Sequence, residues 1–371
     1  MIWSTTATKD TTIFEKDPYR NAGLDQVMEL RKEGDSSKSN LSESRILIQF
    51  DLSKLGNVLT ENGISVSNIS ASLRLHTVQE SELPKSYTLE ARALSANWSN
   101  GTGYVTSPAG KVSNSATTDG ATWISTAGTG SATWNSQLTS GSAVIYNTGS
   151  AGGGVFFTSS VASQSFNFKT TDNIDIDVTQ IVKNWANNVY TNNGFVVSFK
   201  NSELTASNSP NTLIQIYSSD THTVFEPQLY VSWTGSITYN TGSMSLLTYE
   251  DSPVVYTRSF KGEYLRDKKV RVLLGSRAKY PRPSFAQNST FATMKAIPQN
   301  SYYQIKDAHN NEIIIPYSQF TKINTKSDGA YFDFYTTMMY PERYYKFEIK
   351  TEFDGITEYF SASDFTFKIV E

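Results

Sequence analysis

The segment 44–53 constrains the fold of this chain more than any other. Its apolar residues occupy every second position: Ile46, Ile48, Phe50 and Leu52. Such residues line one face of an extended strand, whereas a helix returns to the same face only about every 3.6 residues. The same alternation recurs in segments 71–76, 195–199 and 229–233. This pattern predicts strands of a β-sandwich.

Length and composition favour an all-β protein with two cores. The chain has 371 residues, among them 21 tyrosines and 20 phenylalanines, and Ser, Thr, Asn and Gly fill the spaces between apolar runs. Aromatic residues are common in strands, and small polar residues are common in turns. We expect a first unit at 1–234, a small polar linker at 235–243 and a second unit at 244–371.

One helix is expected inside the first unit. Apolar residues follow helical spacing between 178 and 189, and Asp177 stands where an N-cap acceptor would stand. The expected strands of the second unit include 269–274, 301–305, 312–315, 330–335, 344–350 and 365–370. Short strands at this spacing predict an immunoglobulin-like sandwich.

Several classes of protein fit this sequence poorly. The net charge is −3, which gives no reason to expect nucleic acid or an anionic membrane as a partner. The chain has no cysteine, and we expect neither a Sec-type signal nor a membrane span. Its three histidines, at 76, 222 and 309, are far apart, and no catalytic motif accompanies them. We therefore expect a protein that is not an enzyme.

A long excursion at 97–154 is rich in Gly, Ser and Thr but carries large aromatic residues. Loops of this length are usually functional or partly disordered. Trp98, Trp123, Trp134 and Tyr104 are candidates for a platform on which sugar rings stack. The alternative, which we favour, is that the tryptophans anchor the loop, each contributing about 2–3 kcal/mol on burial.

Acidic residues suggest a possible calcium site where a strand meets the expected helix. Asp172, Asp175 and Asp177 supply the hard oxygen ligands that calcium prefers. The same spacing would place Asp175 and Asp177 on one strand face, as in a carboxylate pair of a glycoside hydrolase. The simpler interpretation is that Asp177 caps the helix and Asp175 is solvated. Apart from structural calcium, we expect no cofactor.

Tyrosines gather in the second unit at positions suited to protein contacts. Tyrosine combines apolar area with a hydroxyl group and is enriched at interfaces. The candidates are Tyr302, Tyr303, Tyr340, Tyr344 and Tyr345. Some of them are expected in the core and some at a partner surface.

Taken together, segments of the first unit resemble the DNRLRE family, a jelly-roll module similar to carbohydrate-binding modules. The matching segments are 10–14, 44–53 with its R-x-hydrophobic-hydrophobic-x-F-D-L-S pattern, 71–75, 119–123, 176–179 with Trp185, 194–195 and 226–229. The resemblance covers roughly residues 7–233 and implies an N-terminal jelly-roll β-sandwich. The last third more weakly resembles C-terminal β modules of tailed-phage virion proteins, in segments 301–307, 313–317 and 340–348.

These resemblances imply a non-enzymatic structural component of a tailed-phage virion, at the neck, tail, baseplate or capsid surface. Such a protein is assembled in the host cytoplasm and contacts other virion proteins and further copies of itself. The alternative is a carbohydrate-binding adhesin module that recognises a cell-surface polysaccharide through Trp98, Trp123 and Trp134.

Overall fold

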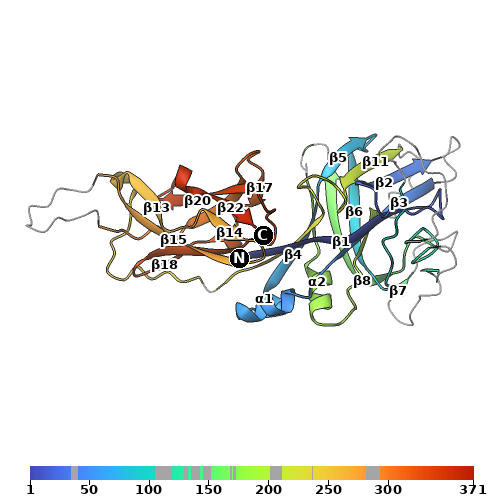
Figure 1. Ribbon diagram of the computed structural model, residues 1–371, viewed down its shortest axis with the longest axis horizontal. Coiled ribbons are helices and arrows are strands. Elements are labelled where there is room, and N and C mark those ends of the chain that lie inside the picture. The colour runs from blue at the N-terminus through green and yellow to red at the C-terminus, as the bar shows by residue number, and fades with distance from the viewer. Residues whose placement is uncertain are drawn as a thin grey trace, which may run out of the picture. The chain divides into compact units, whose positions relative to one another are not determined.

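The computed structural model describes residues 1–34, 41–104, 119–128, 133–134, 143–144, 152–167, 169, 173–200, 211–235, 237–280 and 293–371. The chain forms two compact units. The N-terminal unit comprises Thr5–Val231, and the C-terminal unit comprises Ser232–Glu371 together with Met1–Ser4. Strands dominate both units (Figure 1), so the predicted all-β class is confirmed.

The division between the units differs from the expected one at the start of the chain. Met1–Ser4 was expected in the first unit but groups with the C-terminal unit. The hydrogen bonds that hold it there include one from the Met1 amino group to the Trp233 carbonyl at 2.8 Å, one from the Trp233 amide to the Met1 carbonyl at 3.0 Å and one from the Ser4 amide to Thr337 Oγ1 at 3.5 Å. Strands β1 (Ile2–Phe14) and β12 (Gln228–Trp233) therefore each contribute residues to both units.

The remaining strands of the N-terminal unit are β2 (Val27–Gly34), β3 (Leu41–Phe50), β4 (Ile69–Leu75), β5 (Thr77–Ser81), β6 (Ser86–Leu94), β7 (Ala143–Val144), β8 (Phe156–Asn167), β9 (Ile174–Asp177), β10 (Phe195–Phe199) and β11 (Thr212–Tyr217). Their order is β7-β8-β6-β10-β3-β1-β12-β4-β9, with β2 pairing β3 and β11, and β5 pairing β11.

Strand β3 is the centre of this arrangement. Residues 44–50 pair with β1, residues 46–48 also pair with β10, and residues 41–43 pair with β2. Ile46, Leu47 and Ile48 are all fully buried. The alternation in the sequence correctly predicted the face of Ile46 and Ile48, but the opposite face, with Leu47, is covered as well. β3 ends at Phe50, so Leu52 lies beyond it.

The described residues of this unit form two α-helices, where one was expected. Helix α2 (Thr179–Ala186) is the predicted one, and it buries Ile181, Val182 and Trp185. Helix α1 (Leu55–Glu61) was missed because it is short and has no side-chain cap, although its apolar residues lie at helical spacing. No helix in the described ranges is long and apolar enough to cross a membrane.

The C-terminal unit contains two further sheets. Its strands are β13 (Pro253–Ser259), β14 (Glu263–Leu265), β15 (Lys269–Ala278), β16 (Ser301–Asp307), β17 (Ile313–Ile315), β18 (Asn324–Lys326), β19 (Gly329–Tyr335), β20 (Tyr344–Phe353), β21 (Ile356–Phe360) and β22 (Thr366–Val370). One sheet has the order β13-β15-β19-β18, and the other has the order β14-β22-β20-β16-β17, with β21 beside β20. All six strands predicted for this unit are present.

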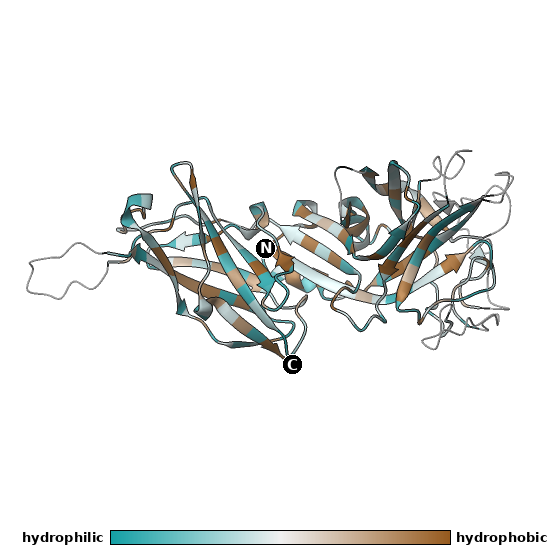
Figure 2. Cartoon of the chain, turned by 90° about the horizontal axis from the view of Figure 1, so that it is seen from above, coloured by the Kyte–Doolittle hydropathy of each residue, from teal (hydrophilic) through white to brown (hydrophobic). Residues whose placement is uncertain are grey.

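Aromatic rings fill the space between these two sheets. From β19, Phe332 stacks on Tyr303 of β16 with ring centres 4.2 Å apart, and Phe334 lies 5.5 Å from Phe367 of β22. Hydrophobic and hydrophilic residues alternate along many strands (Figure 2). This unit is therefore a β-sandwich with an aromatic core. The finer jelly-roll and immunoglobulin-like topologies stay predictions.

An ionisable group lies deep in the N-terminal unit. The side chain of Asp10 on β1 is almost completely buried, and its Oδ2 accepts a hydrogen bond of 2.7 Å from the Ser219 amide. Burial disfavours the charged carboxylate and raises the pKa of Asp10 to about 7. The native state therefore holds a proton on Asp10 at pH values where the unfolded chain, with the ordinary pKa of 3.8, has lost it.

This shift predicts a pH dependence of stability. The pKa of Asp10 is higher in the folded state than in the unfolded state. Its contribution to the free energy of unfolding, up to about 4 kcal/mol, is therefore fully present below pH 4 and is lost as the pH rises through about 7. Asp10→Asn keeps an oxygen acceptor without the charge. The variant should unfold at a higher urea concentration than the parent at pH 8, and at nearly the same concentration at pH 4. Exposed Glu61→Gln is the control. An equal pH dependence in Asp10→Asn and the parent would contradict the assignment.

Candidate functional site

The three tryptophans of the long excursion are buried together. Trp98, Trp123 and Trp134 are at most 3% exposed and belong to one hydrophobic cluster that includes Leu47 of β3. Trp98 Nε1 donates to the Asn193 carbonyl at 2.9 Å. Stacking of sugar rings needs exposed ring faces, which these side chains do not have. The platform hypothesis is therefore corrected, and the tryptophans act as anchors, as the alternative proposed.

A buried asparagine fixes the same excursion to the start of the chain. Asn21 Nδ2 donates to the carbonyls of Asn100 and Ala121, and its Oδ1 accepts from the amides of Gly23 and Gly103, at 2.8–3.0 Å. Gly120, with φ +82°, packs so closely that a Cβ there would lie 2.4 Å from Asn21 Nδ2. The excursion is thus held by a fully bonded polar group as well as by indole rings.

Tyr104 does not share the burial of the tryptophans. It is 40% exposed and is followed by residues outside the described ranges. Without the three indole rings, a single exposed tyrosine does not make a stacking platform.

The candidate calcium ligands have other partners. Asp175 accepts a hydrogen bond of 3.3 Å from Arg74 and is ion-paired with it. Asp177 Oδ1 accepts a hydrogen bond from the Thr179 amide at 2.9 Å. Asp177 lies one residue before the N-cap of α2, which is Val178, and Val178 makes no side-chain capping bond. Asp172 lies outside the described residues. Within the described ranges, no group of three acidic or histidine residues is arranged for a metal, so the calcium site stays an untested prediction.

The five candidate contact tyrosines separate into core and surface residues. Tyr303 and Tyr345 are each 1% exposed; the Tyr303 hydroxyl donates to the Asp333 carbonyl at 3.0 Å, and the Tyr345 hydroxyl accepts from the Tyr340 amide at 2.8 Å. These two are core residues, which corrects their assignment to a partner surface. Tyr302 and Tyr340 are half-buried, and Tyr344 is 56% exposed.

A row of tyrosine and lysine side chains crosses the outer face of the six-stranded sheet. Tyr302 of β16 lies opposite Lys350 of β20, and Lys350 lies opposite Tyr359 of β21. Residues opposite each other on neighbouring strands share one face, and strands lie about 4.8 Å apart, so the two tyrosines are separated by about 10 Å. Tyr359 is 57% exposed. The inner face of the same strands carries the aromatic core.

Beside this row, Glu348 organises two neighbours. Its Oε2 accepts from Lys306 Nζ at 2.9 Å and from the Tyr317 hydroxyl at 3.0 Å. Burial and the adjacent carboxylate both raise the pKa of Tyr317, so its hydroxyl remains a donor. The Tyr317 ring lies 6.1 Å from that of Tyr359. We call this set the tyrosine face: Tyr302, Lys306, Tyr317, Glu348, Lys350 and Tyr359.

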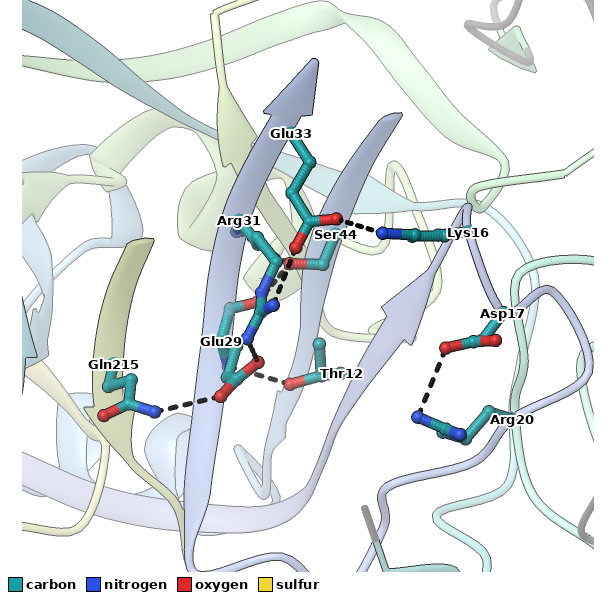
Figure 3. A network of polar contacts seen from close by, with 9 residues as sticks. All are labelled: Thr12, Lys16, Asp17, Arg20, Glu29, Arg31, Glu33, Ser44 and Gln215. Carbon is teal, nitrogen blue, oxygen red and sulfur yellow. Dashed lines mark hydrogen bonds and ion pairs between the residues drawn. The ribbon is translucent and has the colours of Figure 1, made fainter. Parts of the chain in front are cut away.

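A second feature is a polar cavity in the N-terminal unit (Figure 3). It lies where β3 changes partners, since Glu43 pairs with Lys32 of β2 and Ser44 pairs with Phe14 of β1. The volume is about 180 Å³. The lining residues are Phe14, Lys16, Asp17, Arg20, Glu29, Arg31, Glu33, Ser42, Glu43 and Ser44.

Four charged residues of the polar cavity, Lys16, Glu33, Arg31 and Glu29, form a continuous hydrogen-bonded chain. Arg31 donates to Glu29 at 2.9 Å and to Glu33 at 2.7 Å. Glu29 also accepts from Gln215, at 2.9 Å, and Glu33 accepts from Lys16, at 2.8 Å (Figure 3). Burial alone would raise the pKa of Glu33, but its bonds to Lys16 and Arg31 outweigh burial and hold the pKa below its ordinary value. Glu33 is therefore charged at neutral pH.

Sequence reasoning missed the polar cavity and, apart from Tyr302, the members of the tyrosine face. The alternation Glu29, Arg31, Glu33 was a usable signal, because such residues share one strand face. The tyrosine face had a weaker signal, since its members come from β16, β20, β21 and a loop that only the sheet brings together.

The comparisons with known proteins assign no family to this chain. A scan against protein-family models finds no match, and a search of curated proteins finds no relative. The resemblances to DNRLRE modules and to phage virion proteins therefore stay predictions.

The anchoring role of the tryptophans can be tested by truncation. Trp134→Ala should lower the free energy of unfolding of the N-terminal unit by about 3–5 kcal/mol, because it removes a fully buried indole ring. Tyr104→Ala, the exposed control, should change it by less than about 0.5 kcal/mol. Urea unfolding measures both values. Equal small effects would show that Trp134 is not an anchor.

Proposed function

We propose that this protein is a non-enzymatic structural component of a tailed-phage virion that acts through protein–protein contacts. The tyrosine face is the observation that carries this proposal. Its exposed Tyr359 and half-buried Tyr302 flank Lys350 on a regular sheet. The resemblance of the last third to virion β modules supports the same assignment.

The chemistry of the tyrosine face suits a protein partner. Tyrosine provides large contact area with few rotatable bonds and a hydroxyl for the rim of an interface. Lys306 and Tyr317 already bond to Glu348, so little side-chain freedom is lost when a partner binds. The face is also nearly neutral, because lysines and a glutamate alternate on it. It therefore needs no strongly charged partner.

The partner that fits best is another virion protein or a further copy of this chain. In a symmetric particle each modest contact is repeated, so the affinity of one copy need not be high. Neck, tail, baseplate and capsid decoration are all positions where this holds. Assembly would take place in the host cytoplasm.

Substitution of the two tyrosines of the row tests the proposal. Tyr302→Ala with Tyr359→Ala should reduce incorporation into particles by about tenfold or more, because interface tyrosines often contribute more than about 1 kcal/mol each. Tyr249→Ala, a 45% exposed tyrosine outside the face, is the matched control. Quantitative mass spectrometry of purified particles gives the copy number, and gold-labelled antibody places the protein. Absence of the parent protein from particles, or full incorporation of the double variant, would overturn the proposal.

A further inference from the structure

We propose that the outer face of the four-stranded sheet in the C-terminal unit binds an acidic segment of a protein partner. The tyrosine face belongs to the other sheet of this unit, so the two surfaces are distinct. The inference goes beyond the proposed structural function and does not rest on it. We call this surface the cationic face and define it by Lys269, Arg271, Lys326, Tyr331 and Asp333.

The cationic face begins with the densest run of cations in the chain. Four of the six residues at 266–271 are lysine or arginine. Strand β15 starts inside this run, and its side chains alternate between the two faces of the sheet. Val270 and Val272 are buried in the core. Lys269 and Arg271 are exposed on the other face, where they form a cationic row.

The neighbouring strand β19 contributes one carboxylate to this face. The Asp333 side chain lies opposite Arg271 and is only 3% exposed. Arg271 Nε donates to Asp333 Oδ1 at 2.7 Å, and Arg271 Nη2 donates to Asp333 Oδ2 at 2.8 Å. Lys269 Nζ lies 3.7 Å from the same carboxylate. One negative charge thus meets two positive charges, and Arg271 is fixed in orientation by only two of its five N–H donors.

A third cation comes from β18. Lys326 is exposed, and it makes no ion pair in the part of the chain that the structure describes. Its Nζ lies 4.8 Å from the centre of the Tyr331 ring, and the Arg271 guanidinium lies 4.4 Å from the same centre. The ring attracts both cations and so orients them. Three cations against one buried carboxylate leave a surplus of positive charge on the cationic face.

The spacing of these cations fits carboxylates carried by a polypeptide. Lys269 and Arg271 are two residues apart on one strand face, so their Cα atoms are separated by about 7 Å. Alternate residues of an extended acidic segment have the same spacing, and residues four apart on a helix have a similar one. Two carboxylates of one segment can therefore pair with both cations at once. Complementary charge of this kind steers a partner and fixes its orientation.

Nucleic acid fits the cationic face less well. Proteins that bind single strands combine a positive groove with aromatic rings on which bases stack. Here cations already lie over the Tyr331 ring, and the Asp333 carboxylate would repel a phosphate. The whole chain also has a net charge of −3, which disfavours a long polyanion.

The test is fluorescence anisotropy of the full chain with a labelled decaglutamate peptide. We expect binding at about 50 mM salt that weakens about tenfold or more at about 500 mM, because exposed charges are screened. A Gly-Ser peptide of equal length should not bind, and an oligothymidylate of equal length should bind at least about fivefold more weakly than decaglutamate. No binding of decaglutamate, or equal or tighter binding of the oligothymidylate, would overturn the proposal.

Charge-reversal variants place the binding on the cationic face. Lys269→Glu with Lys326→Glu should weaken decaglutamate binding about tenfold at low salt. Lys326→Glu alone, which breaks no ion pair among the described residues, should weaken it about threefold. Lys85→Glu with Lys261→Glu reverses two exposed lysines elsewhere and is the matched control. Unchanged binding in the first double variant, or an equal loss in the control, would overturn the site.

The readouts separate this inference from the proposed function. Tyr302→Ala with Tyr359→Ala alters the tyrosine face only and should bind decaglutamate like the parent. Incorporation into particles is measured independently of peptide binding. A failure of the cationic face to bind decaglutamate therefore leaves the proposed structural function intact.

Discussion

The N-terminal unit depends on the burial of β3 on both faces. Ile48 and Leu47 point to opposite sides of the strand and are both inaccessible to solvent. Leu47 lies in the same cluster as the three tryptophans, so the long excursion is needed to cover that face. β3 also pairs with three strands, and the polar cavity opens where it passes from one partner to another. The core and the polar cavity therefore both depend on the position of β3.

Polar groups that enter the interior of this unit are, with few exceptions, matched by specific partners. Asn21 satisfies three backbone groups of the excursion and the amide of Gly23. Arg45 donates to the Gly153 carbonyl at 2.7 Å and is paired with Glu43. Together with the buried tryptophans, these bonds place a Gly- and Ser-rich segment. Among the described residues of this unit, the buried side-chain atoms without a hydrogen-bond partner include Glu43 Oε2, Arg31 Nε, Trp123 Nε1 and Trp185 Nε1.

The C-terminal unit uses the two faces of one sheet for different purposes. On β20, Phe347 and Ile349 face the aromatic core, while Glu348 and Lys350 face outward. Because side chains alternate strictly along β20, the residues that stabilise the core and the residues that face outward are different ones. Substitutions on the outer face should therefore leave the core unchanged. This separation is what makes the tyrosine face testable without unfolding the unit.

The sequence by itself determined the all-β class, the predicted strands of the C-terminal unit and helix α2, because each depends on a local period of apolar residues. It also predicted anchoring by tryptophan as the favoured alternative. It missed α1, the strands β13, β14, β18 and β21 of the C-terminal unit, and several strands of the N-terminal unit, such as β6 and β8. Only the tertiary structure decided that Tyr303 and Tyr345 are core residues and that Glu29, Arg31 and Lys16 line one cavity. Those outcomes depend on strand register and on which strands pair, and a single sequence does not specify either.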